Sequence, residues 1–169
     1  VKRAGYLQKI QKSSAILLSI INNVLNMARI EKGTIAINES AWSAEQLNDT
    51  IYSVFHDMMK EKNIKLSREI NVEHPYVYCD YIKLQEVFIN ILSNALKYTN
   101  PGGKIQMKVK EIPCDKPGYV LYQTAISDTG VGMSASFLPH IFEEFSREHT
   151  STENKVEGTG LGMPIVKKL

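Results

Sequence analysis

Three polar side chains recur on one face of a segment that is otherwise apolar. In the stretch NILSNALKYT, Asn90, Asn94 and Lys97 are separated by four residues and then by three. Residues at these spacings lie on the same face of an α-helix. Two amides and an ammonium group could bind a polar ligand together, but a solvated helix face would show the same pattern. The choice between these readings depends on the rest of the chain.

The helix that carries this stripe is predicted to begin after Asp80, whose side chain is suited to cap the first turn. A turn at residues 100–103 follows it, and then an alternating strand over Lys104 to Glu111. A second strand, YVLYQTAIS, leads to Asp128. The apolar face of the helix is expected to comprise Leu84, Val87, Phe88, Ile91, Ala95 and Tyr98.

The first part of the chain predicts two further helices and two short strands. A heptad seam predicts a long helix over about residues 3–31, with Gly33 as its C-cap. Ser43 and Gln46 resemble a capping box that opens a second helix, which runs to about Lys62. The candidate strands are IKLSREI and YVYC. The seam comprises Leu7, Ile10, Ser14, Leu17, Ile21, Val24 and Ala28.

The composition is that of an ordinary globular protein. The 169 residues are 43% hydrophobic and 22% charged, and 20 basic residues nearly balance 18 acidic ones. This balance gives no support for nucleic-acid binding. No run approaches the roughly 20 consecutive apolar residues of a membrane span. Because the sequence begins and ends within helical patterns, we expect it to be a piece of a longer protein.

Two glycine clusters flank a long loop after Asp128. The first is DTGVG, at residues 128–132, and the second is EGTGLG, at residues 157–162. The second precedes an apolar helical pattern with Pro164 near its first turn, where proline is tolerated. Glycines in such a place let backbone N–H groups approach a phosphate. The clusters match neither a Walker P-loop nor a Rossmann fingerprint, which disfavours both of those nucleotide folds.

Four motifs in this order resemble the catalytic, ATP-binding domain of sensor histidine kinases. The wider class includes gyrase-type topoisomerases, mismatch-repair ATPases and a heat-shock chaperone. NILSNALKYT looks like the asparagine box, DTGVGM the first glycine box, IFEEFSR the phenylalanine box and GTGLGMPIV the second glycine box. The resemblance implies a two-layer α/β sandwich, in which helices cover one face of a mixed, mainly antiparallel sheet. It also implies an ATP lid and one long N-terminal helix.

The resemblance assigns roles to the polar stripe. It implies that Asn94 gives its amide oxygen to Mg²⁺, that Asn90 holds metal-bound water and that Lys97 neutralises phosphate charge. Tyr98 would pack against adenine. Asp128 would accept the exocyclic N–H of adenine, with the backbone at Gly130 and Gly132 against the base. Arg147 would reach the terminal phosphate. The second glycine box would cradle the phosphates through Gly158, Thr159, Gly160, Leu161 and Gly162.

One position separates the kinases from the ATPases of this class. The ATPases have a glutamate one turn before the metal-binding asparagine, where it activates water as a general base. Here that position is Asn90, and an amide cannot take the proton. Phosphoryl transfer to another nucleophile is therefore favoured over hydrolysis.

The histidines depart from the pattern of a complete histidine kinase. None of the four has the context of a phosphoacceptor; His56, which Asp57 follows, comes closest. We therefore expect the acceptor helix before Val1 and the final strands after Leu169. Residues 1–34 would be part of a dimerisation and histidine-phosphotransfer domain, namely its second helix. Residues 35–169 would be the catalytic domain.

The expected partners are ATP, the phosphoacceptor domain of the same protein and the receiver domain of a response regulator. The parent protein is expected to be a homodimer in the cytoplasm, with a membrane anchor outside this chain as an option. Two alternatives stay open: an anti-sigma-type serine kinase or switch, and a non-catalytic ATP-binding scaffold. The long N-terminal seam disfavours the first of these, and the complete set of ligand residues disfavours the second.

Overall fold

The computed structural model describes residues 2–148 and 158–169, which divide into two compact units. One unit comprises residues 37–138 and contains both sheets. The other combines residues 1–36 with residues 139–169. The predicted division into residues 1–34 and 35–169 rests on the family resemblance and stays a prediction.

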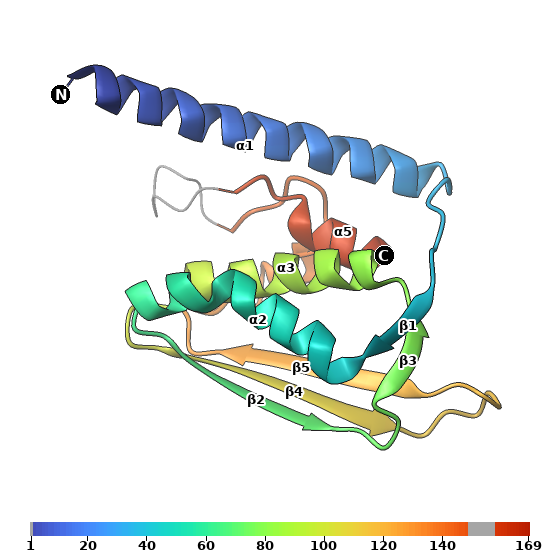
Figure 1. Cartoon of the computed structure of the whole chain (residues 1–169). Helices are drawn as coiled ribbons and strands as arrows, with labels where there is room; N and C mark the ends of the chain where they lie inside the picture. Colours follow the sequence, from blue (N-terminus) through green and yellow to red (C-terminus); the bar gives the residue numbers. More distant parts are fainter. Residues whose placement is uncertain (1, 149–157) are drawn as a thin grey trace. The chain divides into compact units, whose positions relative to one another are not determined.

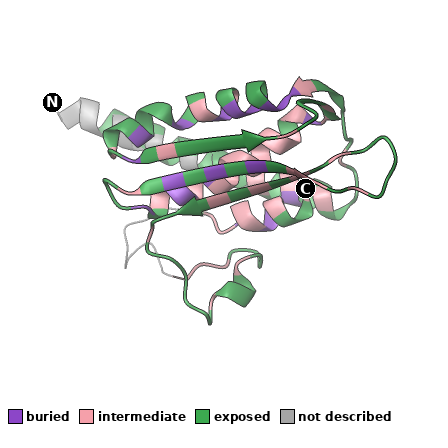
Figure 2. Cartoon of the chain, turned by 90° about the horizontal axis from the view of Figure 1, so that it is seen from below, coloured by how far each residue is buried: buried purple, intermediate pink, exposed green. Residues whose placement is uncertain are grey.

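The larger sheet is mixed, as expected. Its middle strand, β4 (Lys104–Ile112), pairs in parallel with β2 (Lys65–Asn71) and antiparallel with β5 (Leu121–Asp128). Alternate residues of β4 are buried, and the residues between them are exposed. Figure 2 shows this alternation along the middle strand, as expected for a sheet covered on one face only.

The second sheet is a short antiparallel pair of β1 (Ser40–Ser43) and β3 (Tyr76–Cys79). Both strands lead directly into helices. Ser43 is the N-cap of α2 (Ala44–Glu61) and accepts the Gln46 N–H, while Asp80 is the N-cap of α3 (Tyr81–Tyr98). The ring of Trp42 stacks on that of Tyr81, with centroids 4.0 Å apart. Both predicted caps are therefore confirmed.

Helices α2 and α3 cover one face of the larger sheet (Figure 1). Their amphipathic faces meet in the main hydrophobic core of this unit. The loop after α2 is also tied to α3, because the Lys62 Nζ donates to the carbonyl oxygen of Leu96 at 2.8 Å. The buried core residues are Leu47, Ile51, Phe55, Met59, Ile64, Leu92, Ala95, Leu96 and Ile105.

The buried face of α3 differs in part from the predicted one. Leu92 and Leu96 are buried but were not assigned to that face, whereas Ile91 is only partly buried. Tyr98, predicted on the apolar face, is 37% exposed. The spacing of apolar residues on α3 is compatible with more than one face, and packing against α2 and the sheet selects one.

The other unit pairs the long helix α1 (Lys2–Glu31) with the short helix α5 (Gly162–Lys168) (Figure 1). Met27, Leu161 and Ile165 form its buried cluster. The described seam residues of α1 are exposed, including Leu7 and Ile10 at 61% each. The face of α1 that packs in this unit is therefore centred on Met27 and not on the predicted seam.

The length and apolar composition of Ser13–Glu31 would also suit a membrane span, contrary to our expectation from consecutive apolar residues. Core helices of soluble proteins and signal sequences pass the same test; Met27 is buried against α5, but only 6% of this segment is buried. Length and composition alone do not distinguish these cases.

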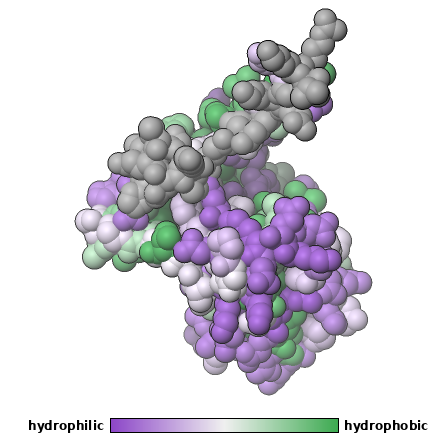
Figure 3. All heavy atoms as spheres, turned by 90° about the vertical axis from the view of Figure 1, so that its left-hand side faces the viewer, coloured by the Kyte–Doolittle hydropathy of each residue, from purple (hydrophilic) through white to green (hydrophobic). Residues whose placement is uncertain are grey.

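The loop after β5 has little regular structure within its described part. The predicted amphipathic piece over residues 137–145 forms a single 3₁₀ turn, η1 (Leu138–His140). The predicted lid runs from about Ser134 to Lys155, and its last part lies outside the described residues, which omit 149–157. The face of the molecule drawn in Figure 3 is mainly hydrophilic, with smaller apolar areas.

Candidate functional site

The polar stripe of α3 has the predicted arrangement. Asn90, Asn94 and Lys97 are partly buried, on a helix whose opposite side contributes to the core. The Asn90 Nδ2 donates to the carbonyl oxygen of Glu86 at 3.0 Å, so its amide oxygen faces away from that bond. The Lys97 Nζ lies 5.3 Å from the centroid of the Tyr98 ring. The three polar side chains therefore lie on one partly buried side of α3, while its other side packs in the core.

Asn94 differs from Asn90 in its hydrogen bonding. Within the part of the chain that the structure describes, no hydrogen bond holds its side chain. Its amide oxygen is thus available to a ligand. A neutral oxygen on a partly desolvated helix face is a ligand that Mg²⁺ accepts, together with phosphate oxygens and water. The residue present fits the metal that the family resemblance implies.

The start of α3 is fixed by its N-cap, Asp80. The carboxylate accepts the Asn38 N–H at 2.9 Å and the Lys83 N–H at 3.0 Å. These bonds, the one from Asn38 first, hold the pKa of the Asp80 carboxyl below its usual value. The cap thereby anchors the helix that positions the polar stripe.

Asp128, at the end of β5, is oriented by a tight turn. Its Oδ1 accepts the Gly130 N–H at 2.8 Å, which leaves Oδ2 for another partner. A Cβ at Gly130 would lie 2.6 Å from that Oδ1 and 2.7 Å from the carbonyl oxygen of Tyr98. Only glycine fits at this position.

The same turn is joined to both neighbouring elements. The Val131 N–H donates to the carbonyl oxygen of Tyr98, the last residue of α3, at 3.3 Å. The Thr129 Oγ1 accepts the Lys104 N–H at 2.9 Å, at the start of β4. The structure therefore brings the first glycine motif to the end of the helix that bears the polar stripe. The role of Thr129 was not predicted from the sequence, because its only signal there is a threonine beside the end of a strand.

The second glycine motif lies in the other unit, together with Phe145. Gly160 has a φ of +71°, and a Cβ there would be 2.7 Å from the carbonyl carbon of Phe145. Leu161 is buried, and its N–H donates to the Thr159 Oγ1 at 3.2 Å. The Leu161 side chain therefore serves the core. Its predicted contact with phosphate would have to come from the surrounding backbone.

The remaining predicted residues are placed as follows. Gly132 has a φ of +72° with open space around it, Gly158 is exposed and Gly162 is the first residue of α5. Arg147 is partly buried. Sequence reasoning missed Asn23, whose Nδ2 lies 3.5 Å from the Thr159 Oγ1 within the same unit. Asn23 lies between Asn22 and Asn26 on α1, and nothing in the sequence distinguishes it as the one that makes this long-range contact.

Comparison with known proteins identifies the family of this chain. Residues 79–169 match the family described as histidine kinase-, DNA gyrase B- and HSP90-like ATPases, and the chain belongs to this family. Residues 79–169 form a catalytic ATP-binding domain of the histidine kinase type.

Several named relatives are histidine kinases. The chain is 34% identical to hybrid signal transduction histidine kinase D of Dictyostelium discoideum over 96% of its own length and 10% of that protein. It is 30% identical to the autoinducer 2 sensor kinase/phosphatase LuxQ of Vibrio vulnificus over 90% of its length and 18% of that protein. The chain thus spans about a tenth to a fifth of the length of these relatives.

Solved structures show the same fold. The match to full-length ShkA in complex with AMPPNP spans 99% of this chain and 33% of ShkA. Its TM-score is 0.78, with 25% sequence identity. The match to the catalytic domain of histidine kinase ThkA, in a nucleotide-free form, spans 78% of this chain and 78% of that domain. Its TM-score is 0.64, with 24% sequence identity. The expected fold, an α/β ATPase domain with an additional N-terminal helix, is confirmed.

Proposed function

We propose that this chain binds ATP together with Mg²⁺ and, within its parent protein, transfers the terminal phosphoryl group to a histidine of a two-component sensor kinase. The acceptor would be a histidine other than the four in this sequence. The observation that carries the proposal is the junction of the polar stripe with the Asp128 turn, made by the bond from the Val131 N–H to the Tyr98 carbonyl. The family also includes ATPases, and Asn90 is the residue that favours transfer over hydrolysis.

Adenine recognition is assigned to the Asp128 turn. Asp128 has one carboxylate oxygen committed to Gly130 and one available to accept the exocyclic N–H of adenine. The absence of a side chain at Gly130 lets the base approach the backbone, and Tyr98 is exposed enough to pack against it. A fixed acceptor beside an apolar face is suited to select adenine over bases that lack the amino group.

The metal and phosphate roles are assigned to the polar stripe and to the second glycine motif. Asn94 would hold Mg²⁺, which neutralises charge that develops on the phosphates. Lys97 would contribute a second positive charge, and Arg147 would stabilise the phosphoryl group during transfer. The backbone around Gly158, Gly160 and Gly162 would contact phosphate oxygens.

Asn90 favours transfer over hydrolysis. Its Nδ2 donates to the helix backbone, so its amide oxygen can accept a hydrogen bond from metal-bound water. An amide oxygen cannot remove the proton of an attacking water at neutral pH. Water near the terminal phosphate is therefore oriented without being activated.

Several properties of the parent protein belong to this proposal. We assign residues 1–34 to a dimerisation and phosphotransfer domain and residues 35–169 to the catalytic domain. The parent would be a homodimer whose phosphoryl group passes on to a receiver domain of a response regulator. The kinase names of the relatives support the sensor-kinase part of this assignment. ATP as the substrate implies that the domain works in the cytoplasm.

The test is incubation of the chain with ATP labelled on the terminal phosphate, alone and with the parent protein's phosphoacceptor domain. We expect little self-labelling, slow hydrolysis at most, and transfer once the acceptor domain is present. The product should be labile to acid and stable to alkali, as a phosphohistidine is. An acid-stable product would favour the serine kinase alternative, and strong self-labelling lost in His56→Gln would identify His56 as the acceptor.

A further inference from the structure

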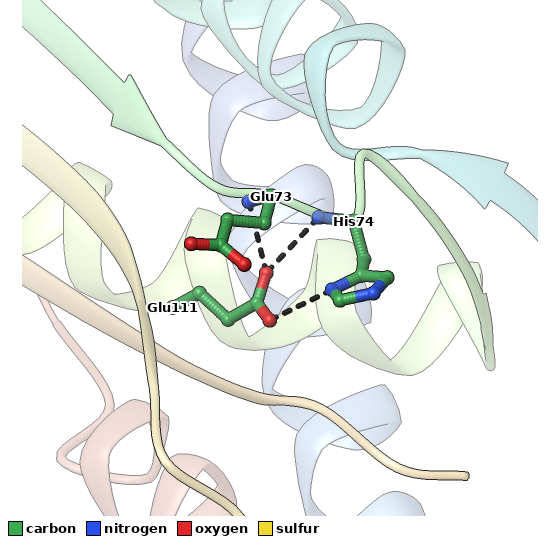
Figure 4. Close-up of side chains that lie close together, drawn as sticks. All are labelled: Glu73, His74 and Glu111. Carbon is green, nitrogen blue, oxygen red and sulfur yellow. Dashed lines mark hydrogen bonds and ion pairs between the residues drawn. The ribbon is translucent and has the colours of Figure 1, made fainter.

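The connection between β2 and β3, residues 72–75, is held by a glutamate from β4. The Glu111 Oε2 accepts two backbone N–H groups, those of Glu73 and His74, each at 3.0 Å. The hydroxyl of Tyr122 donates to the carbonyl oxygen of His74, which fixes the same loop from β5. The positions of the Glu111 carboxylate and of the His74 backbone are therefore set by the fold (Figure 4).

Three potential metal ligands meet at this point. The Glu111 Oε1 lies 2.8 Å from the His74 Nδ1, and the carboxylate of Glu73 lies beside that of Glu111 (Figure 4). One ligand atom from each of the three side chains lies within 4.8 Å of the others. This is the spacing from which a single cation can be reached by all three with small side-chain rotations.

The two carboxylates at this point carry more negative charge than His74, their ion-pair partner among the described residues, can balance. Two carboxylates lie side by side, and in the described parts of the chain neither forms an ion pair with a lysine or an arginine. The Glu73 carboxylate also has no hydrogen-bond partner among these residues. Like charges so close repel each other, and a divalent cation between them would reverse the sign of the interaction.

Glu73 distinguishes this cluster from the other histidine–carboxylate pairs that the structure describes. His56 with Asp57, and His140 with Glu143, are also in contact, at 3.0 and 2.9 Å. Neither pair belongs to a group of three ligands among the described residues. In each of these pairs a hydrogen bond accounts for the contact. The Glu73 carboxylate lies beside that of Glu111 without such a bond to any described residue.

We propose that Glu73, His74 and Glu111 form a binding site for Zn²⁺, separate from the nucleotide site. One imidazole nitrogen and two carboxylate oxygens suit this borderline cation, and water would complete the tetrahedron. The cation would displace the proton between the His74 Nδ1 and the Glu111 Oε1. That proton would pass to solvent, and the imidazole would keep, or take up from solvent, one proton on Nε2. These two atoms would move apart, from 2.8 Å to about 3.3 Å, as two ligands of a tetrahedral zinc ion do.

Calorimetric titration of the whole 169-residue chain with Zn²⁺ alone, without nucleotide, tests the proposal. Glu73→Gln is the decisive variant, because it removes a ligand and breaks no hydrogen bond among the described residues. We expect it to weaken Zn²⁺ binding by about tenfold or more. His56→Gln alters one of the two-ligand pairs and should leave binding unchanged. Equal affinities of Glu73→Gln and the unaltered chain would overturn the proposal.

A second measurement identifies the ligand atom. In nitrogen-15 NMR spectra of the imidazole rings, Zn²⁺ should shift the His74 Nδ1 resonance before any other histidine nitrogen responds. The thermal midpoint of the unaltered chain should rise with Zn²⁺ concentration, and that of Glu73→Gln should rise less. A response at the Nε2, or first at His56, His140 or His149, would contradict the assignment.

Discussion

The backbone N–H of Phe145 donates a 3.0 Å hydrogen bond to the carbonyl oxygen of Gly160. Both residues have positive φ, +61° for Phe145 and +71° for Gly160. This bond joins the phenylalanine motif to the second glycine motif within one unit. The two bonded residues are 15 positions apart in the sequence. A ligand that moves one of these segments must therefore also act on the other.

Replacement of Gly160 by alanine should disrupt this junction. The added Cβ would lie 2.7 Å from the carbonyl carbon of Phe145, in a conformation that alanine already disfavours. We expect a loss of stability from the strained φ and a further loss of about 1–3 kcal/mol from the contact. Weaker ATP binding should accompany it, as measured by urea unfolding and calorimetry.

Gly118→Ala is the matched control for this substitution. Gly118 has a similar φ of +78°, with nothing within 4 Å of the added Cβ. It should therefore show the cost of the strained φ alone. The close contact of Gly160 with Phe145 would be refuted by equal effects of the two substitutions.

Asp128→Asn should weaken ATP binding by about 1–3 kcal/mol, which is roughly 5- to 150-fold. The Gly130 N–H requires an acceptor and would bind the amide oxygen, as it now binds the Asp128 Oδ1. The amide NH₂ would then face the adenine amino group, so that donor meets donor. Asp115→Asn, in the exposed hairpin after β4, is the control for loss of charge. Unchanged ATP affinity in Asp128→Asn would remove Asp128 from the site.

Lys62→Met should destabilise the sheet-bearing unit by about 1–2 kcal/mol. The Lys62 ammonium donates to the carbonyl oxygen of Leu96 at 2.8 Å, near the negative end of α3. Its removal leaves that carbonyl without this donor. Lys60→Met, on the exposed side of α2, is the matched substitution and should have little effect on urea unfolding. Similar losses of unfolding free energy in both variants would argue against a stabilising bond from Lys62 to the end of α3.

The charge of Asp80 should contribute stability that depends on pH. Its folded-state pKa is lowered, so its stabilisation is present above the unfolded pKa of about 4 and is lost as the pH falls through the folded value. Asp80→Asn keeps a good N-cap without the charge. The difference in unfolding free energy between the two proteins should be larger at about pH 7 than at about pH 3. A difference that does not change with pH would contradict this.

Local signals in the sequence predicted the elements well. Ser43 and Asp80 mark helix starts because a capping side chain acts on its own first turn. The alternation in β4 reflects a sheet with one covered face. The polar stripe of α3 was recognised from helix spacing, which is also local, whereas the role of Asp128 came from the family resemblance.

Contacts between distant segments could not be predicted in this way. The burial of Met27 against Leu161, the bond from Lys62 to Leu96 and the hold of Glu111 on the loop at His74 each join residues far apart in the sequence. Their side chains carry no local pattern that indicates a partner. The heptad seam of α1 was a genuine pattern, yet the residues that pack in its unit lie on another face.

The metal dependence of ATP binding by the unaltered chain and by Asn94→Ala tests the central claim most directly. The unaltered chain should bind ATP more tightly when Mg²⁺ is added, because the Asn94 amide oxygen completes the coordination of the nucleotide-bound ion. Asn94→Ala should keep the adenine contacts of Asp128 and lose most of this enhancement by Mg²⁺ in calorimetric titration. An equal enhancement in both proteins, or no ATP binding by the unaltered chain, would contradict the account.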